Sequence, residues 1–249
     1  MTKKFIIVSN PRCGFHYLKS LINQHSKVHC YGELWYFRRK GLEEYNIPKY
    51  KIESSITDYM DSIFECQDQV GKECTGFKIA VNELNNRPTS RKNMIEYINQ
   101  NNIPVIYLKR ENLFQRWCSE SLAIENNAFF GGEYKNKIFM DLDVYIKNCK
   151  YYEKCTNDFF NQLGQVEKIE LTYEELKQNP IESTNNVFDL LQVEKETLDM
   201  KKTTKEQLTG SVFQYLTNGD KLIDEAKKRI EHPNTANRTK EYLQDVINS

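Results

Sequence analysis

Five short apolar segments alternate with helical patterns along most of the chain. In the stretches between them, apolar residues recur every three or four positions, as they do on one face of a helix. Strands that alternate with helices favour a parallel sheet with helices on both faces and right-handed crossovers, so we predict an α/β fold. The predicted strands are residues 4–9, 27–32, 74–80, 104–110 and 166–172, and the predicted helices are residues 15–24, 54–67, 90–100, 111–126, 141–164 and 173–193, the last broken at Pro180.

The charges of the chain are balanced. Its 249 residues include 35 basic and 35 acidic side chains, which argues against a nucleic-acid partner and leaves any anion site to a local cluster of positive groups. No apolar stretch approaches the roughly 20 residues that span a bilayer, so we expect no stable membrane insertion. The apolar run after Lys4 is too short for a signal peptide, which favours a cytoplasmic protein. No linker divides the chain, so we predict a single domain over residues 1–249. The sequence does not indicate the number of subunits.

Seven cysteines are scattered along the sequence. No pair has the CxxC spacing, and no histidine cluster completes a zinc site. We therefore predict buried or reduced thiols and no metal centre. The cysteines are residues 13, 30, 66, 74, 118, 149 and 155.

The first predicted strand leads through a tight turn, SNPRCGFHYL (residues 9–18), into a helix. In a parallel α/β sheet, ligands bind beyond the carboxyl ends of the strands, where this turn lies. A helix that begins near Phe15 directs its first N–H groups and its positive dipole end at the turn, which favours an anion such as phosphate. Gly14 would let the backbone close around that anion, and Arg12 adds a positive charge. A turn of this kind that binds no ligand is the alternative.

Two known nucleotide-binding motifs do not fit this turn. In the pattern GxxxxGK[ST], Lys19 and Ser20 match, but Leu18 and Cys13 stand where the two glycines belong. The dinucleotide-binding pattern GxGxxG is also absent, because Gly14 stands alone.

Four segments, in order along the chain, resemble signatures of the sulfotransferases that use PAPS (3′-phosphoadenosine 5′-phosphosulfate). NPRCGFHYLKSLINQH is similar to the phosphosulfate loop of that family, and VIYLKRENLFQRWCSESLA resembles its strand and helix that bind the 3′-phosphate. IELTYEEL looks like its strand leading into a Tyr-Glu helix start, and KKTTKEQLTGSVFQYLTNGDKL resembles its C-terminal basic loop and a helix ending in Asn. The segment HCYGELW looks closest to the bacterial and carbohydrate-directed branch. The four segments are residues 10–25, 105–123, 169–176 and 201–222.

The resemblance implies a fold, a donor and a reaction. The fold would be a P-loop-like three-layer sandwich with a central parallel sheet flanked by helices, in one sulfotransferase-like domain. The donor would be PAPS, the product PAP, and no metal would be needed. The reaction would be in-line transfer of a sulfuryl group to an acceptor hydroxyl, which depends on positioning, a base and stabilisation of charge on the leaving phosphate.

The resemblance also implies a set of cofactor-binding residues. Loop residues would surround the 5′-phosphosulfate mainly through backbone N–H groups. Arg110 and Ser119 would bind the 3′-phosphate, and Cys118 stands at the alternative spacing for the serine. The loop departs from the family pattern, because Cys13 replaces a serine and Phe15 and His16 replace hydroxyl residues. His16 could replace a lost donor or act as an acid, or only pack on the helix. The implied cofactor-binding residues are Arg12, Cys13, Gly14, Phe15, His16, Tyr17, Arg110, Ser119, Tyr173, Lys201, Lys202 and Thr203.

The catalytic base of the resembled family lies at or near the end of the second strand. Glu33 follows that predicted strand, and we expect it to accept the proton of the acceptor hydroxyl, in a catalytic group with Arg12 and His16. Burial beside Trp35 would have to raise the pKa of Glu33 for this role.

Three further residues bear on the base. His25 and His29 are the alternatives to Glu33. Lys78 stands on a predicted central strand, where an unpaired ammonium is costly, so we expect it to point into the cleft.

The sequence does not identify the molecule that would accept the sulfuryl group. Residues 35–50 and 126–134 are polar and rich in aromatic side chains, which suits stacking on sugar rings but also a phenol or a lipid head group. Of these acceptors we favour a hydroxyl of a glycan or glycolipid. Residues 126–137 could form a lid or, as we favour, an aromatic plug on the core through Phe129, Phe130 and Tyr134. The alternative functions are a P-loop-type nucleotide kinase and a non-catalytic PAP(S)-binding module, the latter kept open by the altered loop.

Overall fold

The fold was obtained as a computed structural model and forms two compact units. The first comprises residues 1–109 and 155–204, and the second comprises residues 110–154 and 205–249. Two compact units can belong to one domain, so the single domain expected over residues 1–249 stays a prediction. The structure describes residues 3–33, 56–65, 71–85, 88–129, 133–204 and 210–249.

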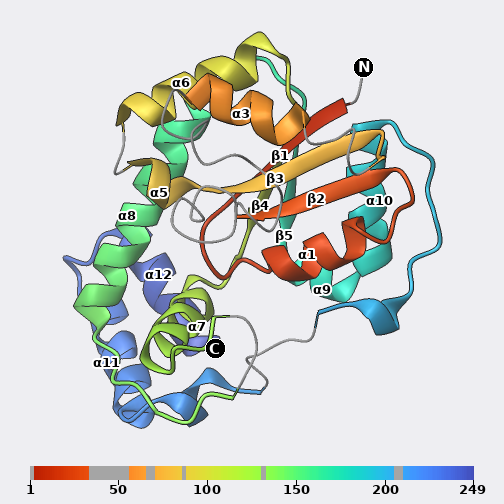
Figure 1. The fold of residues 1–249 in the computed structure, drawn as a ribbon. Helices are drawn as coiled ribbons and strands as arrows, with labels where there is room; N and C mark the ends of the chain where they lie inside the picture. The colour runs from red at the N-terminus through yellow and green to blue at the C-terminus, as the bar shows by residue number, and fades with distance from the viewer. Residues whose placement is uncertain (1–2, 34–55, 66–70, 86–87, 130–132, 205–209) are drawn as a thin grey trace. The chain divides into compact units, whose positions relative to one another are not determined.

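The first unit contains a sheet of five parallel strands in the order β2-β3-β1-β4-β5 (Figure 1). Each strand lies within two residues of a predicted one, because strands covered on both faces are short apolar runs that stand out in the sequence. The predicted α/β fold with a central parallel sheet is confirmed. The strands are β1 (Lys3–Ser9), β2 (Val28–Glu33), β3 (Cys74–Ala80), β4 (Val105–Lys109) and β5 (Lys168–Thr172).

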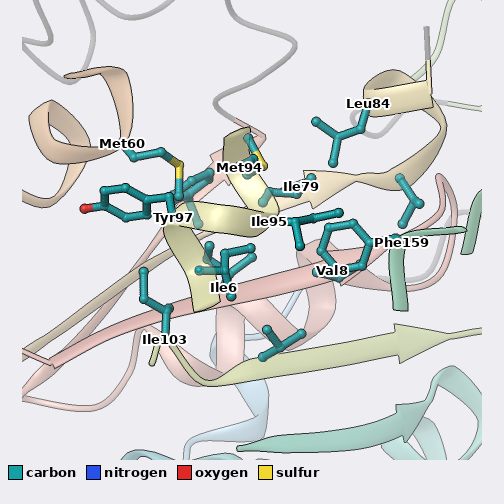
Figure 2. Close-up of a cluster of buried hydrophobic side chains, with 14 of the residues drawn as sticks. Ile6, Val8, Met60, Ile79, Leu84, Met94, Ile95, Tyr97, Ile103 and Phe159 are labelled. Atoms are coloured by element: carbon teal, nitrogen blue, oxygen red, sulfur yellow. The ribbon is translucent and has the colours of Figure 1, made fainter. Parts of the chain in front are cut away.

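Helices cover both faces of this sheet, as the three-layer prediction requires. On one face, Ile6 and Val8 of β1 pack with α3, α6 and the end of α8 around the cluster in Figure 2. On the other face, Phe5 and Ile7 pack with α1 and α10. The alternation along β1 follows the two-residue period of a strand. The helices of this unit are α1 (Phe15–Ile22), α3 (Ile56–Glu65), α5 (Val81–Asn85), α6 (Pro88–Gln100), α9 (Tyr173–Gln178), α10 (Pro180–Leu191) and the end of α8 (Leu142–Phe160).

The second unit is helical, and its core contains Trp117, Tyr145 and Tyr242. The sequence predicted α7 and α8 but not the last two helices. The expected helix ending in Asn is wrong: Asn218 instead precedes α11, where its side chain bonds both backbone groups of Met140. The helices of this unit are α7 (Leu113–Glu125), most of α8, α11 (Gly219–Glu231) and α12 (Asn237–Ile247), with a short 3₁₀ turn, η4 (Val212–Tyr215).

Several smaller expectations can be compared with the structure. Among the described residues, the six cysteines are buried and free, as predicted; Cys66 lies outside them. In the segment 126–137, Tyr134 packs beside Tyr215 as a plug residue would, but Phe129 is 42% exposed, so the plug is at most partial; Phe130 lies outside the described residues. No described helix is both long and apolar enough to cross a membrane.

The edge strand β2 is tied to α1 by one side chain. Asn23, which ends α1, donates Nδ2 to the carbonyl of Cys30 at 3.0 Å and accepts the Cys30 N–H at 2.6 Å. An edge strand has backbone groups that no neighbouring strand bonds, and Asn23 satisfies two of them. This contact fixes the strand that ends at Glu33.

We expect Asn23→Ala to lower the free energy of unfolding by about 1–3 kcal/mol, because two buried backbone groups lose their partners. Urea denaturation measures the change. The matched control is Asn101→Ala, which removes one bond to the Tyr97 carbonyl from an exposed side chain and should cost at most about 0.5 kcal/mol. Equal stability of the two variants would contradict the role of Asn23.

Candidate functional site

The turn after β1 has an unusual backbone. Arg12 and Gly14 both adopt positive φ angles, 64° and 85°, and α1 begins at the next residue, Phe15. The left-handed region strains a residue with a side chain by roughly 1–3 kcal/mol, and such strain gathers at functional sites. Gly14 caps α1 without a side-chain hydrogen bond, so the helix start presents its backbone N–H groups to the turn. The predicted strand, turn and helix are confirmed.

The ring of Tyr173 closes over Gly14. A Cβ on Gly14 would lie 3.0 Å from Cε2 of Tyr173 and closer still to Cδ2, so only glycine fits beneath the ring. Tyr173 is the first residue of α9, and a capping box fixes that helix start: Thr172 accepts the N–H of Glu175, whose carboxylate accepts the N–H of Thr172. The structure places Tyr173, one of the implied cofactor-binding residues, against the turn.

Glu33 and Lys78 form an ion pair at the same end of the sheet. Cys30 pairs with Gly76 and Glu33 with Lys78, so β2 has one residue more than β3 over this stretch. Such a bulge redirects the side chains that follow it, and here it places Glu33 instead of Gly32 opposite Lys78. Lys78 was expected to point into a cleft; the structure shows its ammonium buried and paired with Glu33, and the placement in a cleft stays a prediction.

Two residues of α1 complete this group. The Lys78 ammonium lies over the ring of Phe15, 5.1 Å from its centroid. The ring of His16 meets the ring of Phe15 edge-on, at 5.3 Å between centroids. Lys78 is 2% exposed and Phe15 is 3% exposed, so the cation and the ring are both buried.

The pKa of Glu33 is shifted in the direction opposite to the one its expected role required. Burial alone would raise the pKa of Glu33, but the ammonium of Lys78, with smaller contributions from His16 and Arg12, lowers it below its ordinary value. The expected raised pKa is thus wrong, because the sequence did not show the ion pair. Trp35 lies outside the described residues. Glu33 is held as a carboxylate at neutral pH, which is the form that accepts a proton.

His16 is neutral at physiological pH. Burial lowers its pKa from 6.5 to about 4; the Glu33 carboxylate opposes this shift, while Lys78, Lys19 and Arg12 add to it. A neutral imidazole has one donor and one acceptor nitrogen, so His16 can hydrogen-bond to an anion or accept a proton.

The two alternative bases have other surroundings. His25 is buried, with Nε2 2.7 Å from the carbonyl oxygen of Glu194 and Nδ1 accepting the N–H of Lys27, so both ring nitrogens have backbone partners. His29 packs edge-on against Tyr31, and burial lowers its pKa, as do the charges of Lys19 and Lys72. Neither histidine belongs to the group around Lys78.

A chain segment that contains the predicted basic residues lies along α1. Gln24 exchanges two hydrogen bonds with the backbone of Asp199, and Thr204 donates its hydroxyl to the carbonyl of His16 at 3.2 Å. Between these anchors, the 3₁₀ turn η3 (Met200–Lys202) leaves Lys201 and Lys202 exposed. Thr203 donates its hydroxyl to Met200. The basic residues therefore belong to the same unit as the turn.

In the second unit, the predicted 3′-phosphate residues lie on and just before α7. Arg110 directly follows β4 and is 8% exposed; its Nη2 donates to Oε1 of Gln115 at 3.0 Å. Ser119 is buried on α7. Cys118, the alternative at this position, is buried as well, and burial raises the pKa of its thiol although the charge of Arg110 opposes the shift. The S–H group of a cysteine is a weaker hydrogen-bond donor than the hydroxyl of a serine.

Two polar features escaped the sequence reasoning. Arg116, 1% exposed, donates Nη1 to Glu120 at 2.8 Å and stacks on the ring of Tyr152 at 4.2 Å, which braces α7 against α8. The spacing of four residues between Arg116 and Glu120 was the available signal. Ser9 at the end of β1 has a buried hydroxyl with no hydrogen-bond partner among the described residues. A hydroxyl in this position can donate a hydrogen bond to a bound group.

Comparison with solved structures identifies similar folds. The sulfotransferase from Alicyclobacillus acidocaldarius is 13% identical with a TM-score of 0.56, covering 100% of this chain and 96% of that chain. The sulfotransferase domain from the curacin biosynthetic pathway is 15% identical with a TM-score of 0.54, covering 100% and 98%. The sulfotransferase domain of the olefin synthase from Synechococcus PCC 7002 is 14% identical with a TM-score of 0.51, covering 100% and 95%. At these identities the likeness shows a shared fold. No protein-family model and no curated protein matches the chain.

We expect the imidazole of His16 to titrate near pH 4 in NMR spectra of the folded protein. Glu33→Gln should lower this pKa further, because it removes the carboxylate that stabilises the imidazolium. His29 is the internal control: Glu33 is not among the charges that shift its pKa, so its titration should not move. A His16 ring that titrates near its ordinary value would contradict the buried placement.

Proposed function

We propose that this protein is a sulfotransferase that transfers a sulfuryl group from PAPS to an acceptor hydroxyl. The observation that carries the proposal is the group of Arg12, His16, Glu33 and Lys78 around the strained turn after β1, in a fold shared with sulfotransferases. Such a turn suits an anion, and the group combines positive charge with a carboxylate that can accept a proton.

The residues of the turn fit the 5′-phosphosulfate of PAPS. The start of α1 offers backbone N–H donors, and the missing side chain of Gly14 keeps the backbone accessible. Cys13, Phe15, His16 and Tyr17 would contribute their N–H groups, and the neutral imidazole of His16 would replace a lost hydroxyl donor. The orphaned hydroxyl of Ser9 lies on the strand neighbouring Lys78 and on the same sheet face, where it adds a further donor.

Arg110 and Ser119 would bind the 3′-phosphate. The planar guanidinium of Arg110, buried at the end of β4, has a fork of donors whose geometry suits a dianion. Lys201, Lys202 and Thr203 would add to the binding of that phosphate, and Tyr173 would limit the space beside the turn.

Each member of the catalytic group would have one role. PAPS would supply an activated bond between sulfur and the 5′-phosphate oxygen, so the reaction would need no metal. Glu33 would accept the proton of the acceptor hydroxyl, and Lys78 would keep Glu33 ionised and in place. Arg12 and His16 would stabilise the charge that develops on the leaving phosphate.

The acceptor and the cellular setting are parts of the same proposal. We favour a glycan or glycolipid hydroxyl, supported by the aromatic residues of the segment 126–137, of which Phe129 is exposed. We also propose a cytoplasmic location, and the balanced charge of the sequence supports the absence of a nucleic-acid partner.

A ligand screen tests the donor, with Arg110→Ala as the informative variant. We expect PAP to raise the melting temperature, and ATP and NADH to leave it unchanged. Arg110→Ala should weaken PAP binding by about 10- to 100-fold and leave the weaker binding of AMP, which lacks the 3′-phosphate, unchanged. The matched control is Lys109→Ala, which removes an exposed neighbour paired with Glu170. Stabilisation by ATP with magnesium-dependent hydrolysis would instead indicate a kinase.

We expect Glu33→Gln to preserve PAP binding and to reduce sulfuryl transfer from labelled PAPS by roughly 10²- to 10⁴-fold, because an amide cannot accept the proton. The control is Glu170→Gln, which changes an exposed carboxylate at the outer strand. The melting temperature is measured alongside, since the variant leaves Lys78 without its carboxylate. Full turnover in Glu33→Gln would refute the base assignment. PAP binding without turnover in the unsubstituted protein would indicate a non-catalytic binding module.

A further inference from the structure

Lys78 poses an electrostatic problem for the sheet. It lies on β3, next to the central strand, and is 2% exposed. A buried ammonium is costly unless other groups replace its water. Glu33 supplies the opposite charge on one side, and the ring of Phe15 lies beneath the ammonium, 5.1 Å from it. The face of an aromatic ring carries partial negative charge and attracts a cation at this distance.

Core packing alone does not require an aromatic side chain at position 15. It is the first residue of α1 and is 3% exposed, so an aliphatic side chain of similar volume would also fill the space. Only an aromatic side chain also presents a face to Lys78. The edge contact of His16, at 5.3 Å and 62°, braces the orientation of that ring.

We propose that Phe15 is a positioning residue: the face of its ring holds the Lys78 ammonium, and through it the Glu33 carboxylate, where the base must act. The inference rests on the proposed function where it treats Glu33 as the catalytic base. The contacts of Lys78 with Phe15 and Glu33 do not depend on that function. The side chain of Phe15 does not touch the reacting atoms; it acts through Lys78.

The proposal has a consequence for the ionisation of Glu33. Among the described residues, the charged and titratable groups that act on this carboxylate are Lys78 from β3, His16 from α1 and Arg12 from the turn, with Lys78 the strongest. A weaker hold on Lys78 lessens its effect, so the pKa of Glu33 rises towards its ordinary value. The basic form of Glu33 then forms at higher pH, and the acid limb of the turnover profile moves to higher pH.

The test replaces Phe15 by a series of fluorinated phenylalanines. Successive fluorines withdraw charge from the ring face and barely change its size, so the fold is preserved while the attraction for Lys78 weakens. The pKa of Glu33 is followed by NMR of its labelled side-chain carboxyl in the free protein, and kcat and KM are measured as functions of pH. We expect the pKa of Glu33 to rise with each fluorine, kcat to fall by about 2- to 10-fold across the series, and KM for PAPS to stay constant.

The same series at Phe5 is the matched control. Phe5 is buried in the same cluster as Phe15, and no cation lies over its ring among the described residues, so neither measurement should change there. Phe15→Leu gives the full loss of the ring, and its melting temperature shows whether packing is maintained.

Three results would overturn the proposal. A Glu33 pKa that is constant along the Phe15 series would show that the ring does not hold the pair. A pKa that rises with unchanged kcat would show that the pair is not positioned for catalysis, and equal responses at Phe5 would show a general packing effect. Failure of the proposed function is separate: it would appear as no PAP binding or no turnover in the unsubstituted protein, whereas the NMR titration reports the ring contact with or without activity.

Discussion

The burial of one positive charge determines the arrangement of the candidate site. Lys78 lies within a sheet that is covered on both faces, where water cannot reach its ammonium. The neighbouring strand therefore has to bring a carboxylate to it, and the extra residue in β2 turns Glu33 towards it. The first turn of α1 adds the ring of Phe15. The ammonium of Lys78, the carboxylate of Glu33 and the ring of Phe15 therefore form one interacting group.

The sequence predicted the sheet well because buried parallel strands have a recognisable composition. Each strand is a short apolar run bounded by polar residues, and the helices between them show the period of one covered face. The order of the strands was not predicted, since periodicity does not record which strands are neighbours. Helices α11 and α12 were not predicted, because the resemblance implied a loop and a single helix there, although the apolar spacing places Leu222 and Ala226 on one buried face.

The site itself was predicted in part. The turn, Glu33 and Lys78 were recognised as separate candidates, and the structure brings them together. Their contact was not predicted, because it depends on a bulge of one residue in β2, for which Gly32 inside the strand was the available signal. The wrong direction expected for the pKa of Glu33 has the same origin: burial was anticipated, but the opposing charge of Lys78 was not. The contact of Tyr173 with Gly14, between residues far apart in the chain, was likewise invisible to local patterns.

The contact between Tyr173 and Gly14 has a thermodynamic consequence for ligand capture. The capping box at the end of β5 orients the ring, and the ring restricts the backbone of the turn. The loss of conformational freedom in the turn therefore belongs to folding and not to association. For the anion site that we propose at this turn, the curvature of the backbone would be set before binding, so little binding free energy would be spent on ordering the backbone.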